Sequence, residues 1–408
     1  MSTPDVVSRS HGSGRLTALD GLRGVAALVV LLHHTLLLNP EFPGSPPGED
    51  FTGGALFSWL SFSPLKVFTA GTESVIVFFV LSGLVVSIPA LKHGFDWFAY
   101  FPRRIVRLML PVIASVLVAA AFVVAIPQIS TQVPSTWLSH SSTPSFSWQH
   151  ILTAMDLFGG DAQINNPLWS LRWEVIFSLL LPVFVILAAL LKRWWLAGIA
   201  GALLLTWAGI ATGADSLSYL PAFFVGAMLA VGMDGIRRFT DAVNRRSDHH
   251  VIWLAITLAG AMLLIASWLT GPLPEAATGI THALKALTPL AAAILVVACI
   301  GWSALGRLLS WAPTQFIGKI SFSLYLTHVP ILIFSSYLFA DAPLIVAQIF
   351  GVSLALVVSV AFWWILESRS HGWSKRIGAR ATVGYATVLN ADRQRRPSKA
   401  HKVSASRR

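Results

Sequence analysis

The stretch Leu22–Leu38, LRGVAALVVLLHHTLLL, is long and apolar enough to enter a membrane, yet it contains Arg23 and His34. At about 100° per residue, the eleven positions between these two side chains make about three helical turns. Both therefore lie on one helix face, about 16 Å apart along the axis. Ionisable residues at membrane depth are costly and usually face a protein interior or a water-filled cavity. The stretch predicts a polar site inside a helical membrane protein.

The composition extends this interpretation to the whole chain. Of its 408 residues, 55% are hydrophobic and 12% are charged, and the mean hydropathy is +0.69. Soluble domains carry about 25% charged residues. We therefore expect an all-α, polytopic integral membrane protein with about ten transmembrane helices. Stretches long enough to cross a hydrocarbon core of about 30 Å lie at 19–38, 73–91, 104–126, 168–191, 194–212, 215–233, 251–270, 282–301, 316–339 and 343–366.

The basic residues indicate the orientation. If each stretch crosses the membrane, every Lys and Arg except Arg23, Lys66, Arg172 and Lys285 falls on the same side. That side should be the cytoplasm, which places both termini there in a multi-pass plasma-membrane protein. The net charge of +11 is mainly this topology signal. A nucleic-acid partner is not expected, because the charges are spread over alternate loops and a tail.

Three segments follow from this topology. Residues 1–18 form a cytoplasmic N-terminal segment, 19–366 a transmembrane domain, and 367–408 a basic cytoplasmic tail. Two outer loops, 39–71 and 127–167, are longer than most connections, and such loops are often functional. We expect them to lie beside an acceptor at the outer mouth of the bundle.

Five motifs follow one another along this framework. They are LDGLRG at Leu19–Gly24 with His34 ten residues later, FFVLSG at Phe78–Gly83, RRIVRL at Arg103–Leu108 with Pro111, WSLRWE at Trp169–Glu174, and ISFSLYLTHVP at Ile320–Pro330. In order and character they resemble the motifs of the type 3 membrane acyltransferases. In the second motif, Ser82 and Gly83 are more typical of close helix packing than of a binding segment.

The resemblance makes 19–366 an acyltransferase domain. It implies an enzyme that transfers an acyl group, commonly acetyl from acetyl-CoA, to a hydroxyl of a carbohydrate, a glycolipid, a cell-envelope polymer or a glycosylated natural product. Acyl-CoA would be a co-substrate, and no tightly bound cofactor is implied. The partners expected are the lipid bilayer, acyl-CoA and a hydroxyl-bearing acceptor.

Transfer to a hydroxyl needs a base, and a neutral histidine is suited to that task near neutral pH. His34 is our candidate base; the alternative is a core histidine satisfied by its neighbours. By helical rise, His34 lies about 22 Å from the cytoplasmic start of its span, and Glu174 about 9 Å from the outer end of another. We therefore expect the two to meet, with Glu174 orienting or charge-stabilising the base. The alternative pairs Glu174 with Arg172 on its own helix.

Arg104 and Arg107 lie three residues apart at the cytoplasmic end of a span. Guanidinium groups suit phosphates, and the resemblance implies that these arginines contact the donor. We assign Arg23 to the donor site as well. The alternative for Arg104 and Arg107 is positive-inside anchoring by side chains that reach the membrane surface.

Four further residues are possible site-lining groups. Asp20 precedes Arg23 by three residues and should pair with it, either to position the arginine or simply to neutralise it. Ser170 could donate a hydrogen bond to substrate, or serve in helix packing. Tyr325 and His328 lie three residues apart and could line the same cavity, with bundle packing as the alternative for His328.

Two other functional classes stay open at this point. A secondary transporter, or a flippase component for an envelope saccharide or lipid, would also enclose Arg, His and Glu in a bundle. Transporters usually show interrupted helices in corresponding halves, and no such pairing is visible in this sequence. The twelve histidines show no close metal-ligand spacing, so no metal site is predicted. The acceptor and the acyl chain are not determined by these residues.

Overall fold

The chain folds as a bundle of helices. A computed structural model describes residues 6–44, 53–128, 135–143, 145, 147–158, 164–271 and 278–395, with side chains between residues 17 and 383 of these ranges. These residues form helices and no strand. The all-α architecture predicted from the sequence is thereby confirmed.

Twelve of the elements build the body of the bundle and the helix that leaves it. They are α1 (Val6–Leu36), α3 (Gly71–Ala90), α4 (Trp97–Ala125), α7 (Leu168–Leu190), α8 (Trp195–Thr212), α9 (Asp215–Val231), α11 (His249–Leu264), α13 (Thr278–Ala286), α14 (Thr288–Gly301), α16 (Ala312–Leu338), α17 (Leu344–Phe362) and α18 (Ser368–Arg395). The shorter ones are α2 (Ala55–Phe62), η1 (Pro64–Phe68), α5 (Thr136–Ser141), α6 (Trp148–Met155), η3 (Lys192–Trp194), α10 (Met233–Asn244), α12 (Ala266–Leu269), α15 (Ser303–Leu309) and the π-helix η5 (Trp363–Glu367).

Each of the ten predicted spans falls on a helix. However, only eight of the described helices are long and apolar enough to cross a membrane. The predicted span 215–233 is α9, which forms a pair with α10 bent by 70° and can count as a ninth. The predicted span 251–270 contains α11, which has only 16 residues. The described chain is thus a polytopic membrane protein with eight or nine candidate spans.

Helix α16 is the most enclosed of the eight candidate spans, since 78% of its most apolar stretch is buried inside the bundle. It packs against α1, α4 and α17. The approach of α1 needs small residues, because a Cβ on Gly24 would lie 2.6 Å from the Thr314 carbonyl oxygen and 2.7 Å from the Gly318 nitrogen. A Cβ on Gly318 would in turn lie 2.2 Å from the Asp20 carbonyl oxygen. These glycines therefore allow α1, which carries candidate site residues, to lie close to α16.

Helices α3 and α9 approach equally closely. A Cβ on Gly83 would lie 2.1 Å from the Phe223 carbonyl oxygen, and one on Gly226 would lie 2.2 Å from the Val80 carbonyl oxygen. The packing role expected of Gly83 is confirmed. This contact holds α3 in place, and α3 carries one wall of the site described below.

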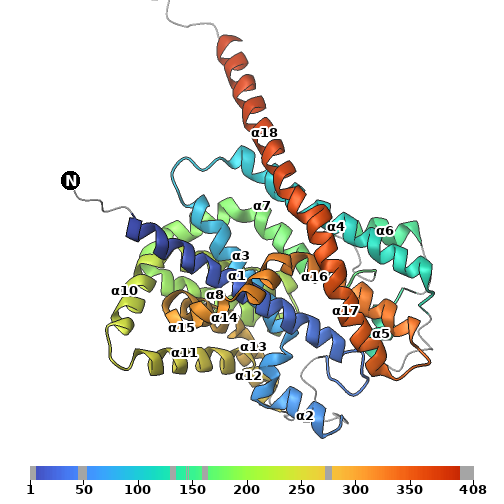
Figure 1. Cartoon of the computed structure of the whole chain (residues 1–408). Helices are drawn as coiled ribbons and strands as arrows, with labels where there is room; N and C mark the ends of the chain where they lie inside the picture. Colours follow the sequence, from blue (N-terminus) through green and yellow to red (C-terminus); the bar gives the residue numbers. More distant parts are fainter. Residues whose placement is uncertain are drawn as a thin grey trace, which may run out of the picture.

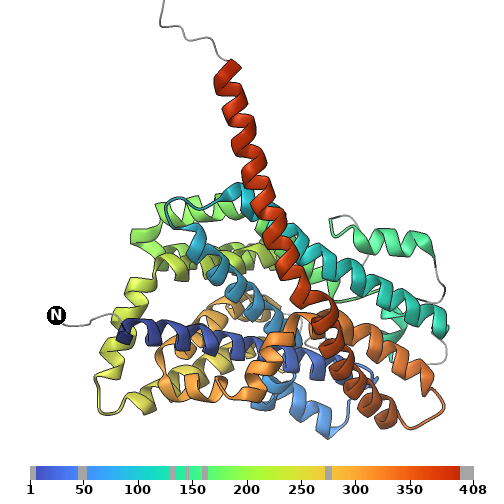
Figure 2. The same ribbon diagram turned by 45° about the horizontal axis from the view of Figure 1, so that its top comes forward.

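The two long loops that we expect on the outer side are partly helical. The described part of 39–71 contains α2 and η1, and that of 127–167 contains α5 and α6. At the other end of the chain, the tail after Glu367 continues as α18, which packs along α4 and then runs out beyond the other helices (Figures 1 and 2). The first part of the basic tail is thus an extension of the last helix of the bundle.

Candidate active site

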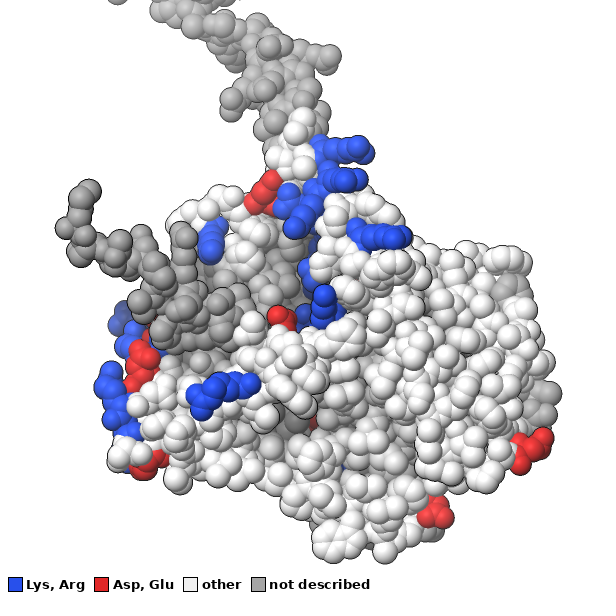
Figure 3. All heavy atoms as spheres, in the orientation of Figure 1, with Lys and Arg blue, Asp and Glu red and all other residues white. Residues whose placement is uncertain are grey.

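A pocket of about 1000 Å³ lies between α1, α3, α4, α7, α16 and the junction of η5 with α18. Figure 3 shows a hollow at the foot of the projecting α18, with acidic and basic atoms at its edge, while much of the same face carries neither. Cationic side chains in the pocket wall belong to Arg23, Arg104, Arg107 and Lys319. Acidic side chains there belong to Asp20, Glu174 and Glu367.

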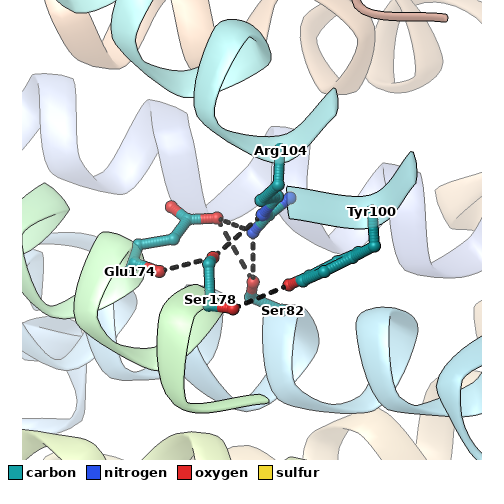
Figure 4. Close-up of polar contacts among 5 residues, drawn as sticks. All are labelled: Ser82, Tyr100, Arg104, Glu174 and Ser178. Carbon is teal, nitrogen blue, oxygen red and sulfur yellow. Dashed lines mark hydrogen bonds and ion pairs between the residues drawn. The ribbon is translucent and has the colours of Figure 1, made fainter. Parts of the chain in front are cut away.

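One ion pair crosses the wall of this pocket, between α4 and α7. Arg104 Nη2 lies 2.7 Å from Glu174 Oε1, and the side chains are only 13% and 22% exposed (Figure 4). Arg104 Nε donates a hydrogen bond to Ser178 Oγ at 3.0 Å. Ser82 Oγ accepts from Arg104 Nη2 at 3.2 Å and donates to Glu174 Oε1 at 3.2 Å. Arg104 is therefore held rigidly, with most of its donors engaged by protein groups.

This network corrects two predictions. Glu174 pairs with Arg104, neither with His34 nor with Arg172. Helical rise gives the depth of a residue but not the neighbour that its face meets: α7 packs against α3, α4 and α9, whereas the helix of His34 packs chiefly against α16 and α3. Ser82, expected to serve packing alone, belongs to the site as well.

Two histidines form a separate polar pair near the end of α1. His328 Nε2 lies 3.2 Å from His34 Nδ1. Each ring also places Nδ1 2.9 Å from the backbone carbonyl four residues earlier, that of Val30 for His34 and that of Leu324 for His328. A carbonyl only accepts, so in neutral rings each Nδ1 carries the proton.

That assignment determines what the other nitrogens can do. His328 Nε2, without a proton, is a second and more distant acceptor for the single His34 Nδ1–H, which it shares with the Val30 carbonyl in a three-centre hydrogen bond. His34 Nε2 is then left with its lone pair, and no described residue donates a hydrogen bond to it. An unpaired ring nitrogen in a half-buried histidine is the form that a general base requires.

A residue of the long loop 127–167 lies beside His34. The ring of Trp137 on α5 lies 5.5 Å from it, centroid to centroid. The adjacent His33 points elsewhere, with Nδ1 2.9 Å from the Thr69 carbonyl oxygen, and its ring lies where a Cβ on Gly71 would be, 2.4 Å from the nearest ring carbon. In the part of the chain with described side chains, no three His, Cys, Asp or Glu residues are grouped so that they could hold a metal ion.

Ser170 and Tyr325 connect the pocket to the histidine pair. Both line the pocket, and their hydroxyl oxygens lie 2.6 Å apart. The Tyr325 ring is 5.9 Å from that of His328, whose ring is 4.9 Å from that of His34. A path of polar side chains therefore leads from the pocket to the candidate base.

The sequence-predicted residues fall into two groups. Those that line the pocket are Asp20, Arg23, Arg104, Arg107, Ser170, Glu174 and Tyr325. His34 and His328 lie outside its wall, beyond Tyr325. The expected pair between Asp20 and Arg23 is wrong: both side chains are described, and the structure forms no ion pair between them. Asp20 is instead an exposed residue at the pocket edge.

Sequence reasoning missed the wall supplied by the end of the chain. Glu367 is buried, and its Oε2 accepts a hydrogen bond from Ser323 Oγ at 2.5 Å. His371 on α18 and Lys319 on α16 also line the pocket. The sequence carries a signal for Glu367, which is an acidic residue at the end of an apolar span, but the predicted segments assign it to the basic cytoplasmic tail.

Comparison with known proteins identifies the family. The model described as an acyltransferase domain, of type 3, matches residues 16–366. The chain belongs to this family of acyltransferases. The match covers all five motifs and the spanning helices that enclose the site.

The chain is also similar to one curated protein. The chain is 26% identical over 349 residues to a protein of Bacillus subtilis (strain 168) named "Putative peptidoglycan O-acetyltransferase YrhL". The aligned region covers 79% of this chain and 49% of that protein, so the chain spans about half the length of the relative. No solved structure matches the chain.

Proposed function

We propose that this membrane acyltransferase transfers an acetyl group from acetyl-CoA to a hydroxyl of a cell-envelope carbohydrate. The observation that carries the proposal is the connection between a cationic pocket and a histidine with a free ring nitrogen, through Ser170 and Tyr325. We place the protein in the plasma membrane with both termini in the cytoplasm, following the distribution of basic residues.

The cationic pocket suits the phosphates of the donor. Arg23 and Arg107 line it, and neither forms an ion pair in the described part of the chain. Their guanidinium groups are available for phosphate oxygens. Arg104 differs, because its pairing with Glu174 leaves it few free donors. In the proposal, Arg107 and Arg23 bind the donor. The ion pair of Arg104 with Glu174 instead joins α4 to α7 and stabilises the pocket wall.

The histidine pair suits the chemistry of transfer. His34 Nε2 takes the proton of the acceptor hydroxyl while that oxygen bonds to the thioester carbonyl carbon. The carbon–sulfur bond breaks, and the proton leaves on the sulfur as the thiol of coenzyme A. Arg23 and His34 are separated by roughly 16 Å of helical rise, and the extended pantetheine arm of the donor would bridge this distance. Tyr325 and Ser170 line that route and supply hydroxyl groups beside it.

The acceptor is proposed from two observations. The relative is named for acetylation of peptidoglycan, and Trp137, in the long loop that we assign to the outer side, lies beside His34. Both favour an acceptor that reaches the base from the outer face. An envelope glycan with free hydroxyls meets this description.

The test is an acetyl-transfer assay with the purified chain in nanodiscs, using acetyl-CoA and soluble peptidoglycan fragments, with products identified by mass spectrometry. His34→Ala should reduce transfer by at least about 100-fold, as the loss of a general base does. Arg107→Ala should weaken acetyl-CoA binding, and Arg107→Lys should restore it only in part, because a lysine cannot form two parallel hydrogen bonds.

Two matched controls come from the same chain. His93, an exposed histidine in the turn after α3, lies outside the site, and Arg103 lies on α4 outside the pocket wall. His93→Ala should transfer normally, and Arg103→Ala should bind the donor normally. A correctly inserted His34→Ala protein with normal transfer would remove the histidine from the mechanism. Transport of the glycan without any acetylated product would favour the transporter alternative.

A further inference from the structure

A second pocket, of about 210 Å³, lies on the far side of α7 from the large one. Trp169, Arg172 and Trp173 line it, whereas Ser170, Leu171 and Glu174 line the large pocket. At 100° per residue these two sets occupy opposite faces of the helix. Because α7 and α9 start here and α6 belongs to the loop before α7, the pocket is at the end of the bundle assigned to the outer side.

From its residues, we propose that this pocket is a saccharide-binding subsite that holds a sugar unit of the acceptor. This rests on the proposed function, which supplies an outer carbohydrate acceptor. The pocket is smaller than the roughly 300–1,000 Å³ of drug-sized ligand sites, so it suits one ring rather than a whole oligosaccharide.

The apolar side of the pocket is a platform of aromatic rings. The Tyr219 ring lies 5.1 Å from that of Trp169 and 5.6 Å from that of Trp173. Trp173 is buried, while Trp169 and Tyr219 remain partly accessible. A sugar ring presents C–H groups on its faces, and broad aromatic faces are the surfaces on which such groups pack.

The polar side supplies groups that pair with hydroxyls. Asp215, in the first turn of α9, and Asp156, after α6, are exposed carboxylates in the pocket wall. Thr153 adds a hydroxyl. Arg172 is fixed by hydrogen bonds to the backbone oxygens of Leu157 and Phe158. Carboxylates accept from hydroxyls, and a few such groups on an aromatic wall would orient a ring.

Other ligand classes fit less well. Two carboxylates disfavour an anion, and a lipid chain would leave these carboxylates without water or a partner. An organic cation would be attracted by the rings, but Arg172 already lies with its guanidinium carbon 5.9 Å from the Trp173 ring centroid. A neutral polyhydroxylated ring uses both the platform and the carboxylates.

The position gives the subsite a role in the reaction. It is separated from the Ser170–Tyr325 contact by one helix, whose diameter is about 10 Å. A sugar held there would place a neighbouring unit of the same glycan near the route to His34. The subsite would thus select glycan over free small alcohols without touching the reacting atoms.

The experiment measures binding of muramidase-released peptidoglycan fragments to the full chain in nanodiscs by calorimetry. Asp215→Asn, which is nearly isosteric at an exposed position, should raise the dissociation constant about three- to tenfold, because the amide oxygen still accepts a hydrogen bond but lacks the added strength that the charge supplies. Trp169→Phe should weaken binding several-fold. The matched controls Asp341→Asn and Trp59→Phe change exposed residues outside the pocket and should bind as the wild type does.

The outcomes separate this proposal from the proposed function. Unchanged fragment affinity in Asp215→Asn and Trp169→Phe, or no binding by the wild type, overturns the subsite even if transfer occurs. Binding of tetramethylammonium in place of the fragments overturns it too, in favour of a cation site. If fragments bind in an Asp215-dependent manner while no acetyl group is ever transferred, the subsite stands and the proposed function falls. In an active enzyme, Asp215→Asn should raise KM for the glycan and leave donor affinity unchanged.

Discussion

His328 and the Val30 carbonyl both contact Nδ1 of His34 and together leave Nε2 as its free nitrogen. The Nδ1 of His328 is fixed on the Leu324 carbonyl, so its Nε2 can only accept from His34. The orientation of His34 therefore depends in part on a residue nearly three hundred positions later in the chain. His328 is a positioning residue in this arrangement, since it does not line the donor pocket.

Replacing His328 tests this role. His328→Phe removes one of the two acceptors of His34 Nδ1–H, and we expect kcat to fall about tenfold while KM for acetyl-CoA stays the same, because only the Val30 carbonyl then holds the orientation of the His34 ring. His328→Gln keeps an amide oxygen that can accept, and it should recover part of the loss. Steady-state kinetics on both variants measure the effect. Equal losses in the two variants, or a change in KM alone, would contradict a positioning role.

Lys66 is a buried cation between α2 and α3. Its Nζ lies 3.3 Å from the Trp268 ring centroid and has no described hydrogen-bond partner. Burial lowers the pKa of Lys66 to about 8, although the nearby Glu73 carboxylate acts in the opposite direction. Lys66 therefore loses its proton at a lower pH in the folded protein than in the unfolded chain.

The sign of the resulting pH dependence follows from linkage. Between about pH 8 and the unfolded value of 10.5, the unfolded state binds more protons, so the contribution of Lys66 to stability rises with pH. Below about pH 8 this contribution is flat. Thermal unfolding of the wild type from pH 7 to pH 10 should show this rise relative to Lys66→Met, which lacks the titrating group. Parallel curves for the two proteins would contradict the lowered pKa.

At the scale of elements, glycines allow the backbones of neighbouring helices to come close together, and these contacts set how the helices are arranged. The contact of α3 with α9 is an example, because the Phe223 carbonyl oxygen occupies the space that a side chain on Gly83 would need. Since α3 also carries Ser82 to the Arg104 network, loss of this contact should disturb the pocket wall.

A pair of matched substitutions tests the packing. Gly83→Ala forces the helices apart and should destabilise the protein by about 1–3 kcal/mol, as overpacking does. Gly201→Ala, on an exposed face of α8 with nothing within 4 Å, should be neutral or stabilise by up to about 1 kcal/mol through helix propensity. Thermal unfolding in detergent measures both. If Gly83→Ala were as stable as Gly201→Ala, close packing would not be what requires the glycine.

At the scale of the whole molecule, we expect the donor and the acceptor to enter from opposite faces. The large pocket is lined by Arg107 in the first half of α4, whereas His34 lies near the far end of α1 beside Trp137. In sealed vesicles of known orientation, acetyl-CoA on the cytoplasmic side should acetylate an impermeant glycan fragment on the other side. Transfer only when both substrates share the cytoplasmic side would defeat this arrangement.

The sequence by itself determined the class of the protein and predicted many of the charged and polar residues that line the large pocket. Apolar length predicted helices at the right places, and the motifs placed Arg23, Arg104, Arg107 and His34 among the functional candidates. These properties are local: hydropathy, spacing and residue chemistry can be read along one helix. For the same reason, the depth of each side chain could be estimated from its helical rise.

Only the tertiary structure decided which side chains meet. Glu174 faces Arg104 across α4 and α7, His34 faces His328, and Glu367 returns from the end of the last span to the pocket wall. The rotation of one helix relative to another depends on packing, here on glycines such as Gly24 and Gly318 that let backbones approach. A sequence specifies such contacts only through the whole fold, because depth and spacing within one helix do not select its neighbour.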